Sequence, residues 1–327
     1  MKILRRVLPY SLCIFVIAFM PFAYKKTSVQ QKLPISSPKH KCILTLWNID
    51  VFEGGVGSRG DFLSNVATKF KSDGVLILVV NHTRESALNS IEQGEFPDMI
   101  SYGVGVDFVV KYAIALPKIE FSGGEQGGKI YAYPWCAGSY FLIRKNQDNQ
   151  PIERLFISQN TYNLPFGAIY LGKIQAENFE YKKPLDAYAN FLSASEKDAL
   201  LGTQRDLKRL EQRGVEFYAE PIDKFCDLIQ YVSVMSQDKQ RYSESVKFLE
   251  YLISQNVQQN LYKIGMASVF YNVYTDSPMT RVNFNNVEYT ISPYTDSTSI
   301  NKMISTASSN NITNNSLVDF KNMLKRL

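Results

Sequence analysis

Histidine is scarce in this chain of 327 residues, which contains only His40 and His82. A serine or cysteine nucleophile with a histidine base would depend on His82 alone, and no G-x-S-x-G motif accompanies it. Cysteine is also scarce, and the four residues lack the close spacing of zinc ligands: Cys13, Cys42, Cys136 and Cys226. We therefore expect no metal site and no triad hydrolase. We expect the last three cysteines to be buried free thiols, with a disulfide among them as the alternative.

Acidic residues are absent from the first 41 positions, which carry eight lysines and arginines. The whole chain has 36 basic and 31 acidic residues, so 28 basic and 31 acidic residues remain after position 41. The net charge of +5 therefore comes from the N-terminal segment, and the rest is slightly acidic. No basic stripe with interleaved aromatic residues is present there, which argues against nucleic-acid binding.

The N-terminal segment, residues 1–26, has the pattern of an export signal or membrane anchor. Basic residues precede an apolar run over residues 7–23, whose length lies between those of a signal-peptide core and a membrane span. The flanking charge places the N-terminus inside. A lipoprotein would need a cysteine at the end of the run, whereas Cys13 lies in its middle. We expect an uncleaved anchor, with cleavage and secretion as the alternative, then a flexible stalk at 27–41 and an extracytoplasmic domain.

Apolar runs alternate with amphipathic segments after the stalk. The pattern predicts strands at 43–49, 75–80 and 99–102, and helices at 61–71 and 85–93. Continuous apolar strands that alternate with helices predict a parallel sheet covered on both faces. Ligands of such sheets bind beyond the carboxyl ends of the strands, here residues 47–50, 81–83 and 101–103.

The rest of the chain also alternates between the two kinds of pattern, which favours a second α/β layer. It predicts a hairpin at 127–135 and strands at 139–144, 198–202 and 227–235. It predicts helices at 184–193, 205–213, 243–254, 258–263 and 316–325.

Five segments, in this order, resemble the extracellular solute-binding proteins of ABC importers, which have the type II periplasmic-binding fold typified by maltose-binding protein. They are ILTLWNID (43–50), ALNSIEQGEFPDMISYG (87–103), KIYAYPWCAGSYFLIRKN (129–146), EKDALLGTQRDLKRLE (196–211) and SVKFLEYLISQNVQQNLYKIGMASV (245–269). The resemblance covers most of residues 43–327. It implies an α/β fold of two lobes with a ligand cleft between them.

The resemblance also implies how the chain is divided and what it does. Lobe 1 would hold residues 43–138 and 235–291, and lobe 2 residues 139–234 and 292–327, with crossings near 134–138, 231–234 and 289–294. The lobes would close around a small-molecule ligand without chemical reaction, and the closed form would bind an ABC permease. We expect a monomer without a cofactor.

A mixture of aromatic and polar side chains is expected to line the cleft. Sugar rings present an apolar face to aromatic residues and hydroxyl groups to amides and carboxylates, so we expect a sugar or oligosaccharide. The candidate ligand-binding residues are Trp47, Asn48, Asp50, Glu53, Tyr102, Trp135, Tyr140, Thr203, Gln204 and Arg205. Arg205 could instead clamp an anionic ligand, and this alternative stays open.

Three other interpretations compete with ligand capture for import. Asp50 and Glu53 could act as acid and base in a secreted carbohydrate-active enzyme. The same fold could also serve a sensor that transports nothing. Residues 55–60 match the dinucleotide motif G-x-G-x-x-G, but the second strand ends in Asn81 rather than an acidic residue. We expect these glycines to form a loop before a helix.

Overall fold

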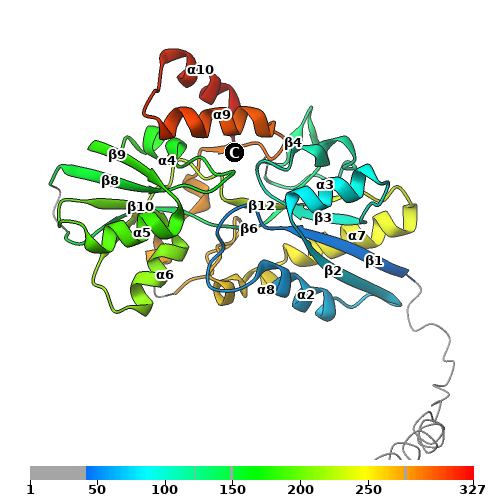
Figure 1. Cartoon of the computed structure of the whole chain (residues 1–327). Helices are drawn as coiled ribbons and strands as arrows, with labels where there is room; N and C mark the ends of the chain where they lie inside the picture. Colours follow the sequence, from blue (N-terminus) through cyan, green and yellow to red (C-terminus); the bar gives the residue numbers. More distant parts are fainter. Residues whose placement is uncertain (1–41, 122, 148–149, 276–277) are drawn as a thin grey trace, which may run out of the picture. The chain divides into compact units, whose positions relative to one another are not determined.

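Two five-stranded sheets organise the structure, a computed structural model that describes residues 42–121, 123–147, 150–275 and 278–327 (Figure 1). The order of the first sheet is β2 (Val75–His82), β1 (Cys42–Ile49), β3 (Met99–Tyr102), β12 (Ile229–Val234), β6 (Tyr133–Ala137). The order of the second is β11 (Tyr218–Pro221), β7 (Tyr140–Arg144), β10 (Ala199–Thr203), β8 (Ile152–Ser158), β9 (Ala176–Lys182). The chain is therefore an α/β protein with mixed sheets.

Three neighbouring strands run parallel in each sheet, which confirms the parallel pairing expected for the first three strands of the chain, and the other strands are antiparallel to their neighbours. In the first sheet, β2, β1 and β3 are parallel, whereas β12 is antiparallel to β3 and β6. In the second, β10, β8 and β9 are parallel, whereas β7 is antiparallel to β10 and β11. Both β7 and β12 enter directly from the other sheet, so no crossover helix sets a parallel direction for them.

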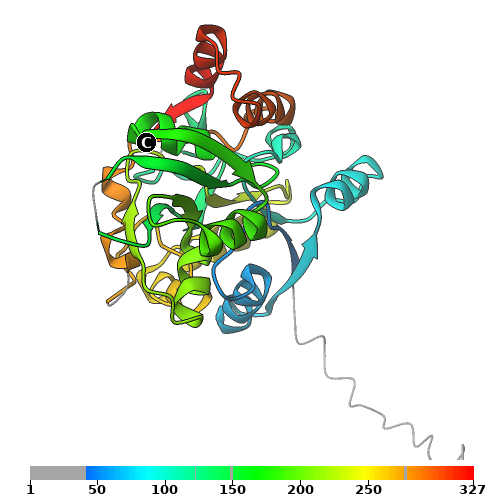
Figure 2. The same cartoon turned by 60° about the vertical axis from the view of Figure 1, so that its left-hand side comes forward.

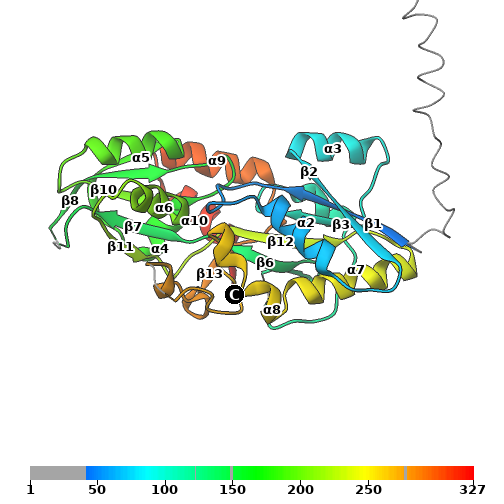
Figure 3. The same ribbon diagram turned by 90° about the horizontal axis from the view of Figure 1, so that it is seen from below.

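Helices pack against both sheets within one compact unit, Cys42–Leu327 (Figures 1 and 3). The first sheet contacts α2 (Arg59–Lys69), α3 (Arg84–Glu92) and α7 (Lys239–Leu252). The second contacts α5 (Pro184–Ser193) and α6 (Gln204–Gln212). Shorter elements are α4 (Pro165–Gly172), α8 (Gln255–Gln258), the hairpin β4 (Glu125–Gln126) and β5 (Lys129–Ile130), and the 3-10 helices Asp107–Lys111, Leu261–Ile264, Pro278–Arg281 and Phe284–Asn286.

Over the described residues, the chain passes from the first five-stranded sheet to the second and back again. It leaves the first sheet after β6 and enters the second at β7, with two residues between the strands. It returns between β11 and β12. Residues 229–234, which the expected division places in lobe 2, therefore pair within the first sheet. Their apolar pattern predicted a strand but carried no information on which sheet would accept it.

Helix α9 (Ser297–Ser308) reaches from the first sheet's helices to the edge strand of the second (Figures 1 and 2). At its start, the Ser297 hydroxyl accepts a hydrogen bond of 3.2 Å from Arg84 of α3. Beyond its end, the Asn310 amide donates to the Phe179 carbonyl of β9 at 3.3 Å. Phe320 of α10 (Asn314–Met323) is buried, and β14 (Leu324–Arg326) then pairs with β13 (Tyr289–Ile291). The C-terminal segment thus contacts elements of both sheets.

A buried carboxylate lies where the chain returns to the first sheet. Asp227 is 2 % exposed and accepts hydrogen bonds from the Tyr140 hydroxyl at 2.8 Å and the Leu164 amide at 2.5 Å. The Asn163 side chain donates to the same hydroxyl at 3.0 Å. Burial raises the pKa of Asp227 from 3.8 to about 6, against the opposing effect of these hydrogen bonds.

Replacing Asp227 with asparagine should remove the pH dependence that this carboxyl group contributes to stability. Its raised pKa means that the folded chain holds the proton more tightly than the unfolded chain. The wild type should therefore lose up to about 3 kcal/mol relative to the variant as the pH rises from about 4 to 7. Urea unfolding at each pH measures this. The new amide adds a constant offset, so a difference that stays constant with pH would contradict the assignment.

Candidate functional site

A pocket of about 490 Å³ opens at the carboxyl ends of β1 and β2. Its walls come from the ends of these strands, the starts of α2 and α3, and the loop that follows β8 in the second sheet. We call it the strand-end pocket, and its lining residues are Asn48, Ile49, Asp50, Val51, Ser58, Asn81, His82, Thr83, Arg84, Glu85, Thr161 and Tyr162. Elements of both sheets therefore contribute to one pocket, at the edge where parallel sheets bind ligands.

Two helices begin at this pocket because each has a capping side chain there. The Ser58 hydroxyl accepts a hydrogen bond from the backbone amide of Asp61 at 3.1 Å, which caps α2. Thr83 caps α3 through a capping box with Ser86. The first turns of both helices carry partial positive charge, which favours ligand oxygens over ligand cations in the pocket.

The floor of the pocket is a buried hydrogen-bond network that fixes Asn48. Its amide donates to Asp50 at 3.1 Å and to Asn81 at 3.0 Å. Its carbonyl oxygen accepts a hydrogen bond from the Ser101 hydroxyl at 3.1 Å. The Trp135 indole in turn donates to Ser101 at 3.0 Å. The network links the ends of three strands to the core and leaves Asn48 itself only 2 % exposed.

Asp50 faces the pocket in front of a buried arginine. Its carboxylate is 47 % exposed and lies 2.9 Å from Nε of Arg59, whose side chain is 2 % exposed. The guanidinium also donates to the Phe52 carbonyl at 2.6 Å and to Gln230 at 3.3 Å. The pair is nearly neutral as a whole, so Asp50 offers acceptor oxygens without adding much net charge to the pocket.

The positive charge of Arg84, on the pocket wall, is also balanced by a nearby carboxylate. It donates to the Gly105 carbonyl at 2.6 Å and pairs with Asp107 at 3.2 Å. Its guanidinium lies 5.8 Å from the centre of the Tyr162 ring, which comes from the loop after β8. Arg84 therefore links α3 with the 3-10 helix at Asp107 and with the second sheet's loop.

His82 supplies a neutral ring to the pocket. Burial lowers its pKa, an effect that the nearby Glu95 carboxylate partly offsets. The ring lies 4.3 Å from the Trp47 ring, measured between ring centres, and Nδ1 is 3.1 Å from the Ser86 hydroxyl. Since neutral imidazole is favoured, His82 offers a flat, uncharged surface and covers Trp47.

The expected aromatic wall lies in the core instead. Tyr102, Trp135 and Tyr140 are fully buried, and Trp47 is 8 % exposed beneath His82. None of these four residues lines the strand-end pocket. The Tyr102 and Tyr140 hydroxyls and the Trp135 indole form hydrogen bonds inside the protein, with Ser233, Asp227 and Ser101 respectively. The rings at the pocket are those of His82 and Tyr162, which the sequence did not single out as site residues.

Four other expected residues lie together, but away from this pocket. Glu53 pairs with Arg209 of α6, and Arg205 donates to the Gly55 carbonyl. Gln204 accepts a hydrogen bond from the Ser139 amide at 3.0 Å, and Thr203 caps α6. Of the ten expected residues, the structure brings only Asn48 and Asp50 to the strand-end pocket.

The glycine motif at 55–60 serves close packing. A Cβ on Gly55 would lie 2.2 Å from the Ile264 carbonyl oxygen, and one on Gly60 would lie 2.1 Å from Asn81. Glycine is therefore required at position 55, which lies against backbone atoms, whereas a side chain at position 60 would have to displace the Asn81 amide.

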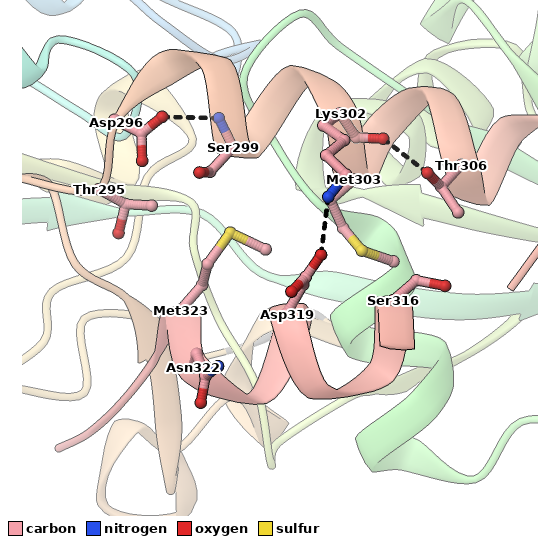
Figure 4. Close-up of a pocket in the computed structure, with 10 residues that line it drawn as sticks. All are labelled: Thr295, Asp296, Ser299, Lys302, Met303, Thr306, Ser316, Asp319, Asn322 and Met323. Carbon is pink, nitrogen blue, oxygen red and sulfur yellow. Dashed lines mark hydrogen bonds and ion pairs between the residues drawn. The ribbon is translucent and has the colours of Figure 1, made fainter. Parts of the chain in front are cut away.

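Two further hollows are weaker candidates. A groove of about 380 Å³ between α9 and α10 is lined by those helices and the two residues before α9, and the exposed Lys302–Asp319 ion pair, 2.8 Å long, bridges it (Figure 4). A hollow of about 660 Å³ is lined only by the second sheet and its loops. Neither combines residues from both sheets.

Cys42, Cys136 and Cys226 are free and buried, as expected. Among the described residues, no group of three or more His, Cys, Asp or Glu side chains is placed to hold a metal ion. Over the same part of the chain, no helix has the length and apolar character needed to cross a bilayer. The expected anchor at 1–26 and stalk at 27–41 lie outside the described residues.

Comparisons with known proteins add no relative to this picture. Neither the models of protein families nor the curated proteins contain a match to this chain.

Proposed function

We propose that this chain is an extracytoplasmic solute-binding protein that captures a small polar molecule in the strand-end pocket. The observation that supports this most directly is that both sheets contribute residues to the pocket. Asn81 and Asp50 come from the first sheet's strand ends, and Thr161 and Tyr162 from the second sheet's loop. A ligand that contacts both sides stabilises the conformation in which the sides are close together.

In the proposed motion, each sheet is the core of one lobe. The lobes would turn about the short connections between β6 and β7 and between β11 and β12, with the C-terminal segment as a third link. No bond of the ligand is made or broken, and no cofactor takes part. The closed form would then bind an ABC permease, and residues 1–26 would tether the monomer to the membrane.

A neutral, hydroxyl-rich ligand such as a sugar or short oligosaccharide fits the pocket best. The volume of about 490 Å³ lies within the usual range for small-molecule sites. Most of its donors and acceptors are amides, hydroxyls and ion-paired groups, and the Glu85 carboxylate is its remaining charge, so an anionic ligand would meet little uncompensated positive charge. The alternative anionic ligand loses its support, because Arg205 donates to the Gly55 carbonyl and does not line the pocket.

A thermal-shift screen of the purified full-length chain tests the function directly. The ligands are sugars, oligosaccharides, amino acids and polyamines. A ligand present at about 100 to 1,000 times its dissociation constant should stabilise the folded state by about 2.7–4.1 kcal/mol. We expect this result from a sugar or oligosaccharide. Hydrolysis of an added glycan would instead establish the carbohydrate-active enzyme, and no stabilisation by any of these ligands would refute solute capture.

Substitutions on opposite walls of the pocket should weaken binding of the ligand so identified. Asn81→Ala and Tyr162→Ala should each raise its dissociation constant about tenfold, since each removes contacts that close around it. Asp319→Ala, in the groove between α9 and α10, is the matched control and should leave affinity unchanged. Calorimetric titration measures all three. Equal affinities for the wild type and both pocket variants would place the ligand elsewhere.

A further inference from the structure

Helix α6 of the second sheet contacts the loop between β1 and α2, residues 50–58, through a bidentate ion pair (Figure 3). The Arg209 guanidinium donates to the two carboxylate oxygens of Glu53 at 2.5 and 3.2 Å. The side chains are 16 % and 27 % exposed, so the pair is partly shielded from water. Bidentate arginine–carboxylate pairs are the strongest and most directional of such contacts.

One turn earlier on the same helix face, Arg205 donates to the Gly55 carbonyl. The carboxylate of Asp206, which is fully buried, forms a second ion pair with Arg209 at 2.9 Å. It also accepts a hydrogen bond from the Thr203 amide at 2.9 Å. Burial raises the pKa of Asp206 to about 6, an effect that the Thr203 amide and Arg209 oppose. Two arginines from successive turns therefore hold one loop.

The far side of the loop is fixed to the first sheet's part of the chain. The Val56 amide donates to the Ile264 carbonyl at 3.0 Å, and Gly55 lies against the backbone of Ile264 and Gly265 without room for a side chain. Arg59 also ties the loop to β12 of the first sheet, because its guanidinium donates to the Phe52 carbonyl and to Gln230. Separation of the two sheets would therefore break the contacts of Arg205 and Arg209.

The same loop also lines the strand-end pocket, through Asp50, Val51 and Ser58. We propose that Glu53 and Arg209 form a latch that holds the two sides of this pocket together before ligand arrives. The latch sets the fraction of molecules already closed, and thereby the apparent affinity. This inference rests on the hinge closure proposed above.

Distances between two spin labels test the latch without any ligand. The labels are attached at Asn89→Cys on α3 and Ala189→Cys on α5, both exposed, in a full-length Cys13→Ser background. The three other native cysteines are buried. Glu53→Gln removes the negative charge that pairs with Arg209 between the loop and α6, and it leaves Arg209 paired with Asp206. We expect the longer-distance population to grow about two- to fivefold relative to the population in the unsubstituted chain, as measured by double electron–electron resonance.

Lys208→Gln is the matched control, because it removes an ion pair of 3.0 Å with Glu211 that stays within α6. Its distance distribution should equal that of the unsubstituted chain. An unchanged distribution in Glu53→Gln would overturn the latch, and so would an equal change in Lys208→Gln. If Glu53→Gln lowers the melting temperature into the working range, Glu53→Asp provides the same test through a shortened side chain. A ligand screen that fails would refute solute capture and leave this result standing.

Discussion

The burial of Arg59 is the constraint on which this end of the molecule depends. A cation that is 2 % exposed needs compensating partners, and these are the Asp50 carboxylate, which forms an ion pair with it, and the Phe52 carbonyl and Gln230, which accept its hydrogen bonds. Its partners fix the path of the chain between β1 and α2. That path places Asp50 at the pocket and Glu53 towards α6. The position of the pocket wall and the contact between the two sheets therefore both depend on the buried charge of Arg59.

Local elements were predictable where the sequence carries a local signal. The first three strands and the two helices between them lie within two residues of their expected bounds, since each has a clear apolar period and a capping or turn residue. Helix α5 matches its expected range of 184–193, because Pro184 is favoured in a first helical turn. The strand ends that line the pocket, 48–50 and 81–83, follow from the same signals.

Elements and contacts that depend on tertiary packing were not predictable. Strand β9 is a sheet edge in which only Ala176, Phe179 and Tyr181 are apolar or aromatic, so it lacks a continuous apolar run. Helix α9 is rich in serine and threonine, with only Ile300, Met303 and Ala307 buried. The segment around β8 was missed, and Tyr162 with it. Aromatic residues at strand ends also gave no sign of facing inward. The indole of Trp135 is buried because Ser101 accepts its hydrogen bond within the core.

The residues that the sequence grouped as one ligand-binding set lie in different places. Asn48 and Asp50 line the strand-end pocket, which we propose as the ligand site, while Glu53 and Arg205 contact across the sheets. Because both sets share the loop at 50–58, a ligand and the latch act on the same equilibrium. A latch that is too strong would keep ligand out, and one that is too weak would leave the ligand to supply the whole energy of closure. A partly exposed pair, typically contributing about 1 kcal/mol or less, lies between these limits.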